Sequence, residues 1–162
     1  MDSGLFKKEK EMTQDLLFLE KAETEASTSN NLDQGYASET LVLSWFLKNG
    51  YEAIPVPGQK KADIWIGDGK YLCRVNVKSS GQIKDGMVRG LSCGGRNEKI
   101  KYSEFDIDII SLVWIESPWP LFFHISADDR KHVSAEPKMF TQENSLTTFH
   151  IAFSKFRERK CP

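Results

Sequence analysis

The sequence predicts a mixed α/β (α+β) fold, because one amphipathic helical pattern is followed by several short apolar strands. The helical pattern ends at Asn49-Gly50, where glycine suits the left-handed position after a helix. Apolar segments of strand length then recur around glycine and proline turns. The composition is 40% hydrophobic, which is enough to build a core in a chain of 162 residues. The sequence therefore predicts that helical structure and a sheet built from these strands belong to one domain.

The elements follow in order from the start of the compact part. Asp33 or Ser38 can cap a helix that runs to about Asn49. Three strands are expected next, the last two joined by a hairpin turn at residues 67–69. Two strongly apolar strands follow later in the chain. The five expected strands cover residues 51–56, 62–66, 70–78, 107–115 and 121–125.

The remaining segments give weaker signals. Residues 79–101 are polar and rich in glycine, and residues 126–148 are expected to form loops and turns with at most a short helix. Residues 150–153 are expected to form a last strand or the start of a helix. A basic tail would then close the chain with Lys155, Arg157, Arg159 and Lys160.

Residues 1–31 differ in composition from the rest and are expected to form a separate extension. Leu5, Met12, Leu16 and Leu19 lie at helical spacing, so an amphipathic helix is expected over about 6–25, followed by a polar linker. This helix is either a solvated extension or a surface that packs on a partner subunit. Residues 32–162 are expected to form a single domain.

Charge and cysteine content exclude several classes of protein. The net charge of −1 excludes a uniformly cationic binder of nucleic acid or membranes, although a local basic patch stays open. No apolar run approaches the roughly 20 residues that span a bilayer, and no signal peptide is visible. The cysteines and histidines are scattered without metal-ligand spacing, which argues against zinc and indicates a cytoplasmic protein with reduced thiols.

Alternation along residues 70–78 predicts a strand with one polar and one apolar face. Because side chains alternate along a strand, Asn76 and Lys78 project together. Their face also carries Leu72 and Arg74, and the other face carries Tyr71, Cys73, Val75 and Val77.

Two carboxylates stand in unusual places. Glu39 lies beside the apolar face of the first helix, where it either reaches solvent at the edge or has a partner. Asp63 opens an apolar strand, where aspartate is either a hydrogen-bonding cap or a metal ligand. With the Asn76 amide, these side chains can hold a divalent cation that prefers oxygen, while Lys78 contacts a phosphate or the attacking water.

The order of these residues resembles the PD-(D/E)XK nuclease superfamily. The resemblance rests on a helix with Glu39, then Ala62-Asp63-Ile64, a hairpin, and Val75-Asn76-Val77-Lys78. Within the superfamily, the chain looks most like the archaeal-type Holliday-junction resolvases and related small endonucleases. The resemblance extends from about Gly35 to Ile125 and implies a restriction-endonuclease-like core, with a mixed central sheet flanked by helices.

The resemblance implies a role for each motif residue. Glu39 and Asp63 match metal-binding carboxylates, and Lys78 matches the lysine that positions the hydrolytic water. In the function that the sequence favours, the Val77 carbonyl is expected as an extra metal ligand. Asn76 falls where the family usually has an acid, so the site has one negative charge fewer. The implied catalytic set is therefore Glu39, Asp63, Asn76 and Lys78, with Mg²⁺ or Mn²⁺ held by Glu39, Asp63, Asn76 and Val77.

Basic residues are concentrated around this motif, as expected of a protein that binds the phosphate backbone. An ordinary solvated stretch is the alternative. The residues expected to contact DNA are Lys60, Lys61, Ser80, Arg89, Arg96 and Lys99.

The sequence thus favours an Mg²⁺-dependent endodeoxyribonuclease, with branched DNA among its substrates. Two alternatives stay open. The first is a nuclease-fold module that binds nucleic acid without cleaving it, and the second is a protein-interaction scaffold that uses exposed Trp114 and Trp119. Because symmetric cleavage needs two active sites, a homodimer is expected. Its interface would use the N-terminal helix or the strand residues Ile109, Leu112, Val113 and Trp114.

Overall fold

The computed structural model describes residues 32–57, 61–67, 69–91, 93, 94, 100, 101, 106–125 and 132–160. The expected N-terminal helix and linker lie outside these residues. The fold belongs to a compact unit over Gly35–Pro162. No helix among the described residues is long and apolar enough to cross a membrane.

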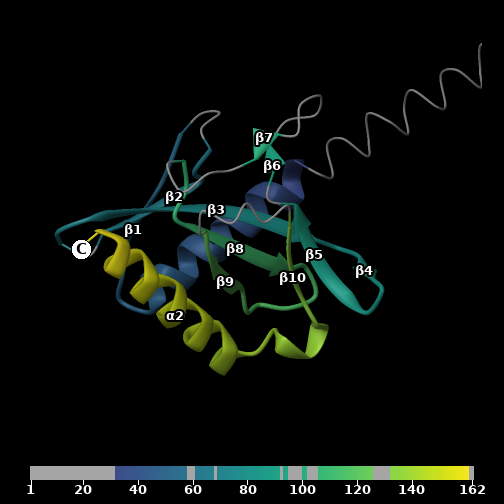
Figure 1. Cartoon of the computed structure of the whole chain (residues 1–162). Helices are drawn as coiled ribbons and strands as arrows, with labels where there is room; N and C mark the ends of the chain where they lie inside the picture. Colours follow the sequence, from purple (N-terminus) through teal and green to yellow (C-terminus); the bar gives the residue numbers. More distant parts are fainter. Residues whose placement is uncertain are drawn as a thin grey trace, which may run out of the picture. The chain divides into compact units, whose positions relative to one another are not determined.

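The central sheet has five strands in the order β1-β2-β3-β8-β9. These strands are β1 (Glu52–Pro55), β2 (Ile64–Gly67), β3 (Leu72–Ser80), β8 (Ile109–Trp114) and β9 (Leu121–His124). Only β3 and β8 run parallel, and the other neighbouring pairs are antiparallel. The prediction of a mixed central sheet is confirmed, and each of its five expected strands is present (Figure 1).

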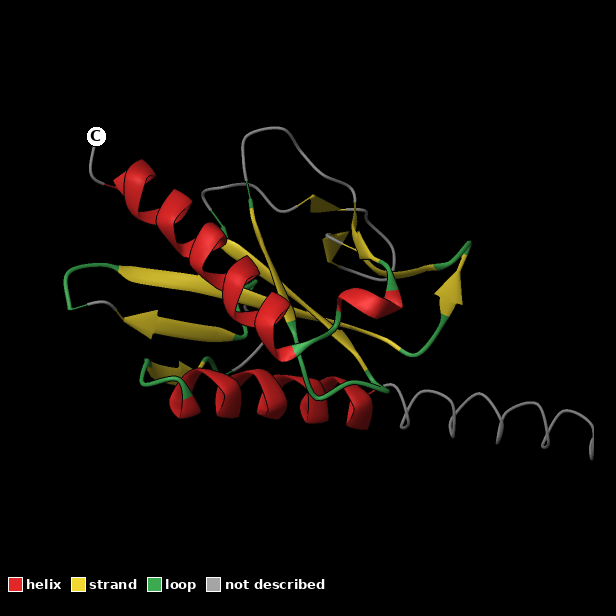
Figure 2. Cartoon of the chain, turned by 90° about the horizontal axis from the view of Figure 1, so that it is seen from below, coloured by secondary structure: helices red, strands yellow, loops and turns green. Residues whose placement is uncertain are grey.

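Two helices pack on one face of this sheet. One helix covers residues 32–48, and the other is α2 (Gln142–Lys160). Both are drawn as long red coils in Figure 2. Apolar side chains of both helices share one buried cluster with Val75 and Val77 of β3. Its aromatic centre is Trp45, Phe46, Phe122 and Phe149, whose neighbouring rings pack at centroid distances such as 4.7 Å between Trp45 and Phe122. This burial supplies much of the hydrophobic stabilisation of the fold.

A second sheet covers the opposite side of the core, and the sequence did not predict it. It has the order β10-β5-β4, with β4 (Ile83–Lys84), β5 (Met87–Leu91) and β10 (His132–Ala135). Val88 and Val133 of this sheet pack with Ile110 and Leu112 of β8 in a second buried cluster. A short pair, β6 (Cys93–Gly94) with β7 (Ile100–Lys101), completes the described strands.

The end of the chain corrects the expectation of a long loop and a basic tail. Residues 126–148 contain β10, a 3₁₀-helix (Pro137–Met139) and the first residues of α2. The supposed tail is the last part of α2, because Phe149, Phe153 and Phe156 continue a buried stripe along this helix.

The surfaces expected to join two copies, or to bind a partner protein, are also corrected. Ile109, Leu112 and Val113 are buried in the core of the chain itself, so they are not free to form an interface. Trp114 and Trp119 are half-buried and pack against the two core clusters. They are structural residues and not exposed contact points.

Candidate active site

Strand β3 carries the polar face that the sequence predicts. Cys73, Val75 and Val77 are buried against the helices. Asn76 and Lys78 lie on the other face, and β3 is held by β2 on one side and by β8 on the other. The central position of β3 therefore fixes where these two side chains begin.

Asp63 lies directly before β2 and is tied to its neighbours by the main chain. Its N–H donates to the carbonyl of Val75 at 2.9 Å, and its own carbonyl accepts from the N–H of Val56 at 2.9 Å. Its Oδ2 accepts from the N–H of Val77 at 2.6 Å and from Nδ2 of Asn76 at 2.8 Å. The carboxylate is thus oriented before any ligand binds.

Asn76 is 3% exposed and uses its amide nitrogen twice. Besides Asp63, Nδ2 donates to the carbonyl of Lys61 at 2.7 Å. The reverse orientation of the amide would place Oδ1 against these two acceptors, so the hydrogen-bond network defines it. Oδ1 of Asn76 is buried and has no hydrogen-bond partner among the described residues. A buried acceptor without a donor is costly, and such a group calls for a ligand.

Glu39 and Lys78 lie within electrostatic reach of Asp63. Burial raises the pKa of Glu39, the charge of Asp63 raises it further, and the charge of Lys78 lowers it. Burial likewise raises the pKa of Asp63, against the hydrogen bond from Val77 and the charge of Lys78. The helix over 32–48, the residue before β2 and strand β3 therefore place Glu39, Asp63 and Lys78 within electrostatic reach of one another. Asn76 is joined to this group by its hydrogen bond to Asp63.

The donor set suits a hard divalent cation. The site offers the carboxylates of Glu39 and Asp63 and the amide oxygen of Asn76, which has no hydrogen-bond partner among the described residues. Mg²⁺ and Mn²⁺ prefer oxygen ligands of this kind. Among the described residues there is no group of three His, Cys, Asp or Glu side chains that could hold a metal ion. A metal site here would accordingly depend on Asn76 as its third side-chain ligand.

Of the residues expected to contact DNA, the structure describes three, and each of them has a partner within the chain. Lys61 pairs with Asp106 at 2.7 Å, and Arg89 pairs with Asp85 at 3.1 Å. The hydroxyl of Ser80 donates to the carbonyl of Gln82 at 3.0 Å. Lys60, Arg96 and Lys99 lie outside the described residues.

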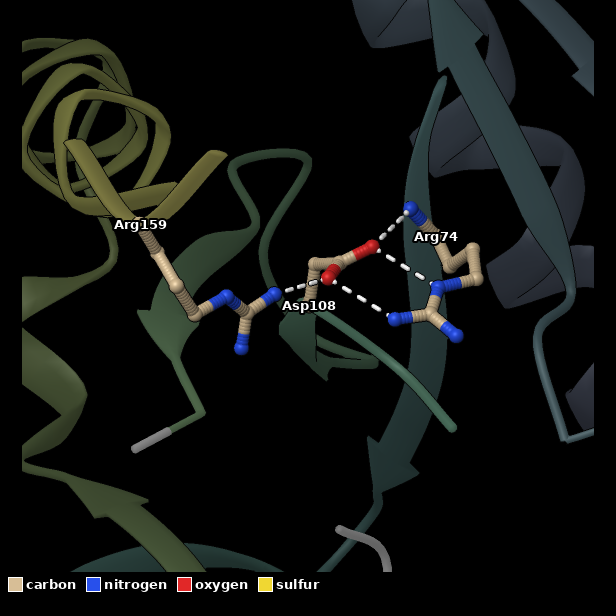
Figure 3. A network of polar contacts seen from close by, with 3 residues as sticks. All are labelled: Arg74, Asp108 and Arg159. Carbon is tan, nitrogen blue, oxygen red and sulfur yellow. Dashed lines mark hydrogen bonds and ion pairs between the residues drawn. The ribbon is translucent and has the colours of Figure 1, made fainter. Parts of the chain in front are cut away.

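Arg74, a basic residue close to the motif in the sequence, belongs to a buried ion network. Asp108 is fully buried and accepts from the main-chain N–H, Nε and Nη2 of Arg74 at 2.8, 2.9 and 3.0 Å. Arg159 of α2 binds the same carboxylate from its other side (Figure 3). The bond to Asp108 is the main cause of the raised pKa of Arg74. This network joins β3, the start of β8 and α2.

Sequence reasoning missed two features of the site. The carbonyl of Lys61 helps to hold Asn76, but a main-chain group leaves no signal in the sequence. Gly90 of β5 packs closely against Lys78, because a Cβ added at Gly90 would lie only 2.9 Å from the Cβ of Lys78. The glycine-rich composition of this segment was the only sign of such close packing.

No family model matches the sequence, and no curated protein matches it either. The fold is similar to that of a bacterial homing endonuclease, I-Ssp6803I, with a TM-score of 0.60 and 18% identity. The match covers 80% of this chain and 97% of the endonuclease. A second similar structure is Hjc, a Holliday junction resolvase from the archaeal hyperthermophile Archaeoglobus fulgidus. Its TM-score is 0.43 at 20% identity, with 65% of this chain and 86% of the resolvase covered. The chain therefore shares the mixed α+β fold of I-Ssp6803I.

Proposed function

We propose that this protein is a metal-dependent endonuclease that hydrolyses DNA phosphodiester bonds. The observation that carries the proposal is the buried Oδ1 of Asn76, which has no hydrogen-bond partner among the described residues. The nitrogen of the same amide group donates to the Asp63 carboxylate. The fold shared with I-Ssp6803I, a homing endonuclease, supports the same function.

Mg²⁺ or Mn²⁺ would be held by Glu39, Asp63 and Asn76, with the carbonyl of Val77 as a further ligand. The ion supplies Lewis-acid stabilisation of the phosphate and a more acidic water. Asn76 and the N–H of Val77 keep Asp63 oriented. The ammonium of Lys78 holds the attacking water beside the carboxylates, which its charge already stabilises.

The partner in this proposal is DNA, bound through its phosphates by Lys60, Lys61, Ser80, Arg89, Arg96 and Lys99. Branched DNA belongs among the substrates to be tested. A homodimer would supply the two sites that cleavage of both strands needs. Since the strand residues first expected at its interface are buried, another surface must join the copies. We place the protein in the cytoplasm, where DNA and reduced thiols such as buried Cys73 occur together.

The test is a cleavage assay on linear, branched and single-stranded DNA with Mg²⁺ or Mn²⁺. We expect cleavage by the wild-type protein, a loss of at least about 10²-fold in Lys78→Ala, and no loss in Lys155→Ala, an exposed lysine of α2. DNA binding without cleavage by the wild-type protein would replace the proposal with a non-catalytic binding module. Equal rates for Lys78→Ala and wild type would remove Lys78 from the site.

A further inference from the structure

Strand β5 approaches β3 and β8 more closely at Gly90 than any residue with a side chain would allow. A Cβ built on Gly90 lies 2.8 Å from Cδ1 of Leu112, 2.9 Å from Cβ of Lys78 and 3.4 Å from Cγ2 of Val133. Gly90 is not among the described glycines with positive φ, so its backbone conformation does not require glycine. Space alone requires it at this position.

The two shortest contacts differ in how easily they can be relieved. Cδ1 of Leu112 is the far end of a flexible side chain and can move aside. Cβ of Lys78 moves only with the backbone of β3, which pairs with β8 through Lys78 and Leu112 themselves. A side chain at position 90 would therefore displace either β5 or the part of β3 that carries Lys78.

The ammonium at the other end of the Lys78 side chain lies within electrostatic reach of the carboxylates of the candidate site. Its charge acts on both Glu39 and Asp63. The contact with β5 helps to hold the β3 backbone in place at Lys78, from which the side chain starts. The electrostatic interactions act at the other end of the side chain.

We propose that Gly90 is a positioning residue for Lys78: it lets β5 pack directly on the Cβ of Lys78 and so aims the ammonium at Glu39 and Asp63. The inference rests on the proposed function for its catalytic consequence, but the position of Lys78 can be measured without it. Gly90 would touch neither DNA nor metal and would act only through Lys78.

The test compares Gly90→Ala with Val133→Ala. Val133 is the β10 residue that pairs with Gly90, and it packs in the second buried cluster, so its truncation weakens the second sheet without placing an atom on Lys78. In Gly90→Ala we expect the single-turnover cleavage rate at saturating DNA to fall about 10²-fold, since misplacing a reacting group by about 1 Å has effects of this size. DNA affinity and Mn²⁺ affinity should stay at the wild-type values. Val133→Ala should lower the unfolding midpoint and keep the cleavage rate.

A direct readout is the NMR signal of the Lys78 side chain, assigned by its absence in Lys78→Ala. It should shift in Gly90→Ala and not in Val133→Ala, whether or not the wild-type protein cleaves DNA.

If Gly90→Ala fails to fold, the same measurements on Gly90→Ala/Leu112→Val apply, because valine lacks the δ-carbon that overlaps. A wild-type rate and an unshifted Lys78 signal in the folded variant would overturn the inference. Full recovery of both in the double variant would do so too, since Leu112 would then be the only neighbour that matters. Absence of cleavage by the wild-type protein would instead overturn the proposed function.

Discussion

Asn76 is the residue at which this chain departs from the acidic pattern expected from the sequence resemblance, and its contacts show what an amide contributes at this position. Nδ2 donates to the Asp63 carboxylate and to the carbonyl of Lys61. A carboxylate at position 76 could make neither bond without a proton. The neutral side chain therefore orients Asp63 and leaves its own oxygen for a ligand.

Replacing Asn76 by aspartate should destabilise the metal-free protein. The substitution removes both donated bonds and places a second carboxylate beside Oδ2 of Asp63, which costs about 1–3 kcal/mol. Mn²⁺ should recover more stability in Asn76→Asp than in wild type, because the added charge strengthens the metal site. Urea unfolding with EDTA and with Mn²⁺ measures both effects.

Asn49→Asp is the matched control, because Asn49 also donates its amide to a carbonyl, that of Trp45, at the exposed end of a helix. Its stability should not respond to Mn²⁺ beyond the wild-type response. An Asn76→Asp variant that is as stable as wild type in EDTA would show that the two donated bonds contribute nothing.

The raised pKa values of Glu39 and Asp63 predict how stability depends on pH. Above their ordinary values of 4.5 and 3.8, the folded state holds protons on these groups that the unfolded state has lost. The metal-free protein should therefore lose this contribution to stability as the pH rises from the ordinary values through the raised ones. Urea unfolding in EDTA between about pH 4 and 8 should show a smaller decline in Glu39→Gln.

Glu116→Gln provides the comparison for this profile, since Glu116 is exposed in the turn after β8. It should keep the wild-type dependence on pH. Identical profiles for Glu39→Gln and wild type would mean that the pKa of Glu39 is not raised in the folded protein.

At the scale of single residues, the sequence predicted which side chains meet but not how they bond. Alternation along β3 correctly placed Asn76 and Lys78 on one face. The donation from Asn76 to Lys61 depends on a main-chain carbonyl brought near by tertiary structure. Residue type and spacing carry no information on such a contact.

Among the elements, the β4–β5 hairpin was missed although its turn has a recognisable sequence. Asp85 and Gly86 have φ of 53° and 73°, as a tight hairpin turn requires. β4 has only two residues, both exposed, and β5 is too short to give a clear alternating pattern. β5 pairs with β10 and buries Val88 against residues of β8. Helix α2 was predicted only as one of two alternatives for residues 150–153 and without its full length, because its first turns are polar and its apolar stripe begins late.

The ion network around Asp108 should be a major source of stability at the level of elements. Asp108→Ala would leave two arginines, one on β3 and one on α2, without their buried partner. Removing one member of a buried ion pair costs about 3–5 kcal/mol. Urea unfolding should show a loss of this size.

The exposed pair of Glu136 with Lys138, at 2.6 Å, offers a contrasting ion pair on the surface. Glu136→Ala should leave the unfolding midpoint almost unchanged, because solvent screens exposed charges. A small loss in Asp108→Ala, comparable with that in Glu136→Ala, would contradict the structural role of the network.

At the scale of the whole molecule, the order of helix and strands was enough to predict the mixed central sheet and the fold that the chain shares with I-Ssp6803I. The second sheet and the course of the chain after residue 126 were not predictable, because these segments become regular only through contacts with the core. The same packing buries the strand residues once expected to join two copies. Dimerisation stays a prediction, to be measured by light scattering.

DNA binding by a chain with a net charge of −1 should depend on a local basic region. Affinity should fall steeply with salt, and each phosphate contact removed should reduce the slope of log K against log salt by about 1. Fluorescence anisotropy titrations of Lys60→Ala and Arg96→Ala at several salt concentrations test this. Lys155→Ala should keep the wild-type slope, and equal slopes for all these variants would place the DNA elsewhere.

The most direct test of the central claim, that these side chains form a metal site, is Mn²⁺ binding measured by calorimetry on wild type, Asp63→Ala and Asp85→Ala. Asp85 is an exposed carboxylate in the β4–β5 turn and serves as the matched control. The account predicts that wild type and Asp85→Ala bind Mn²⁺ equally and that Asp63→Ala does not bind it. Equal binding of Mn²⁺ by Asp63→Ala and wild type, or no binding by wild type, would contradict it.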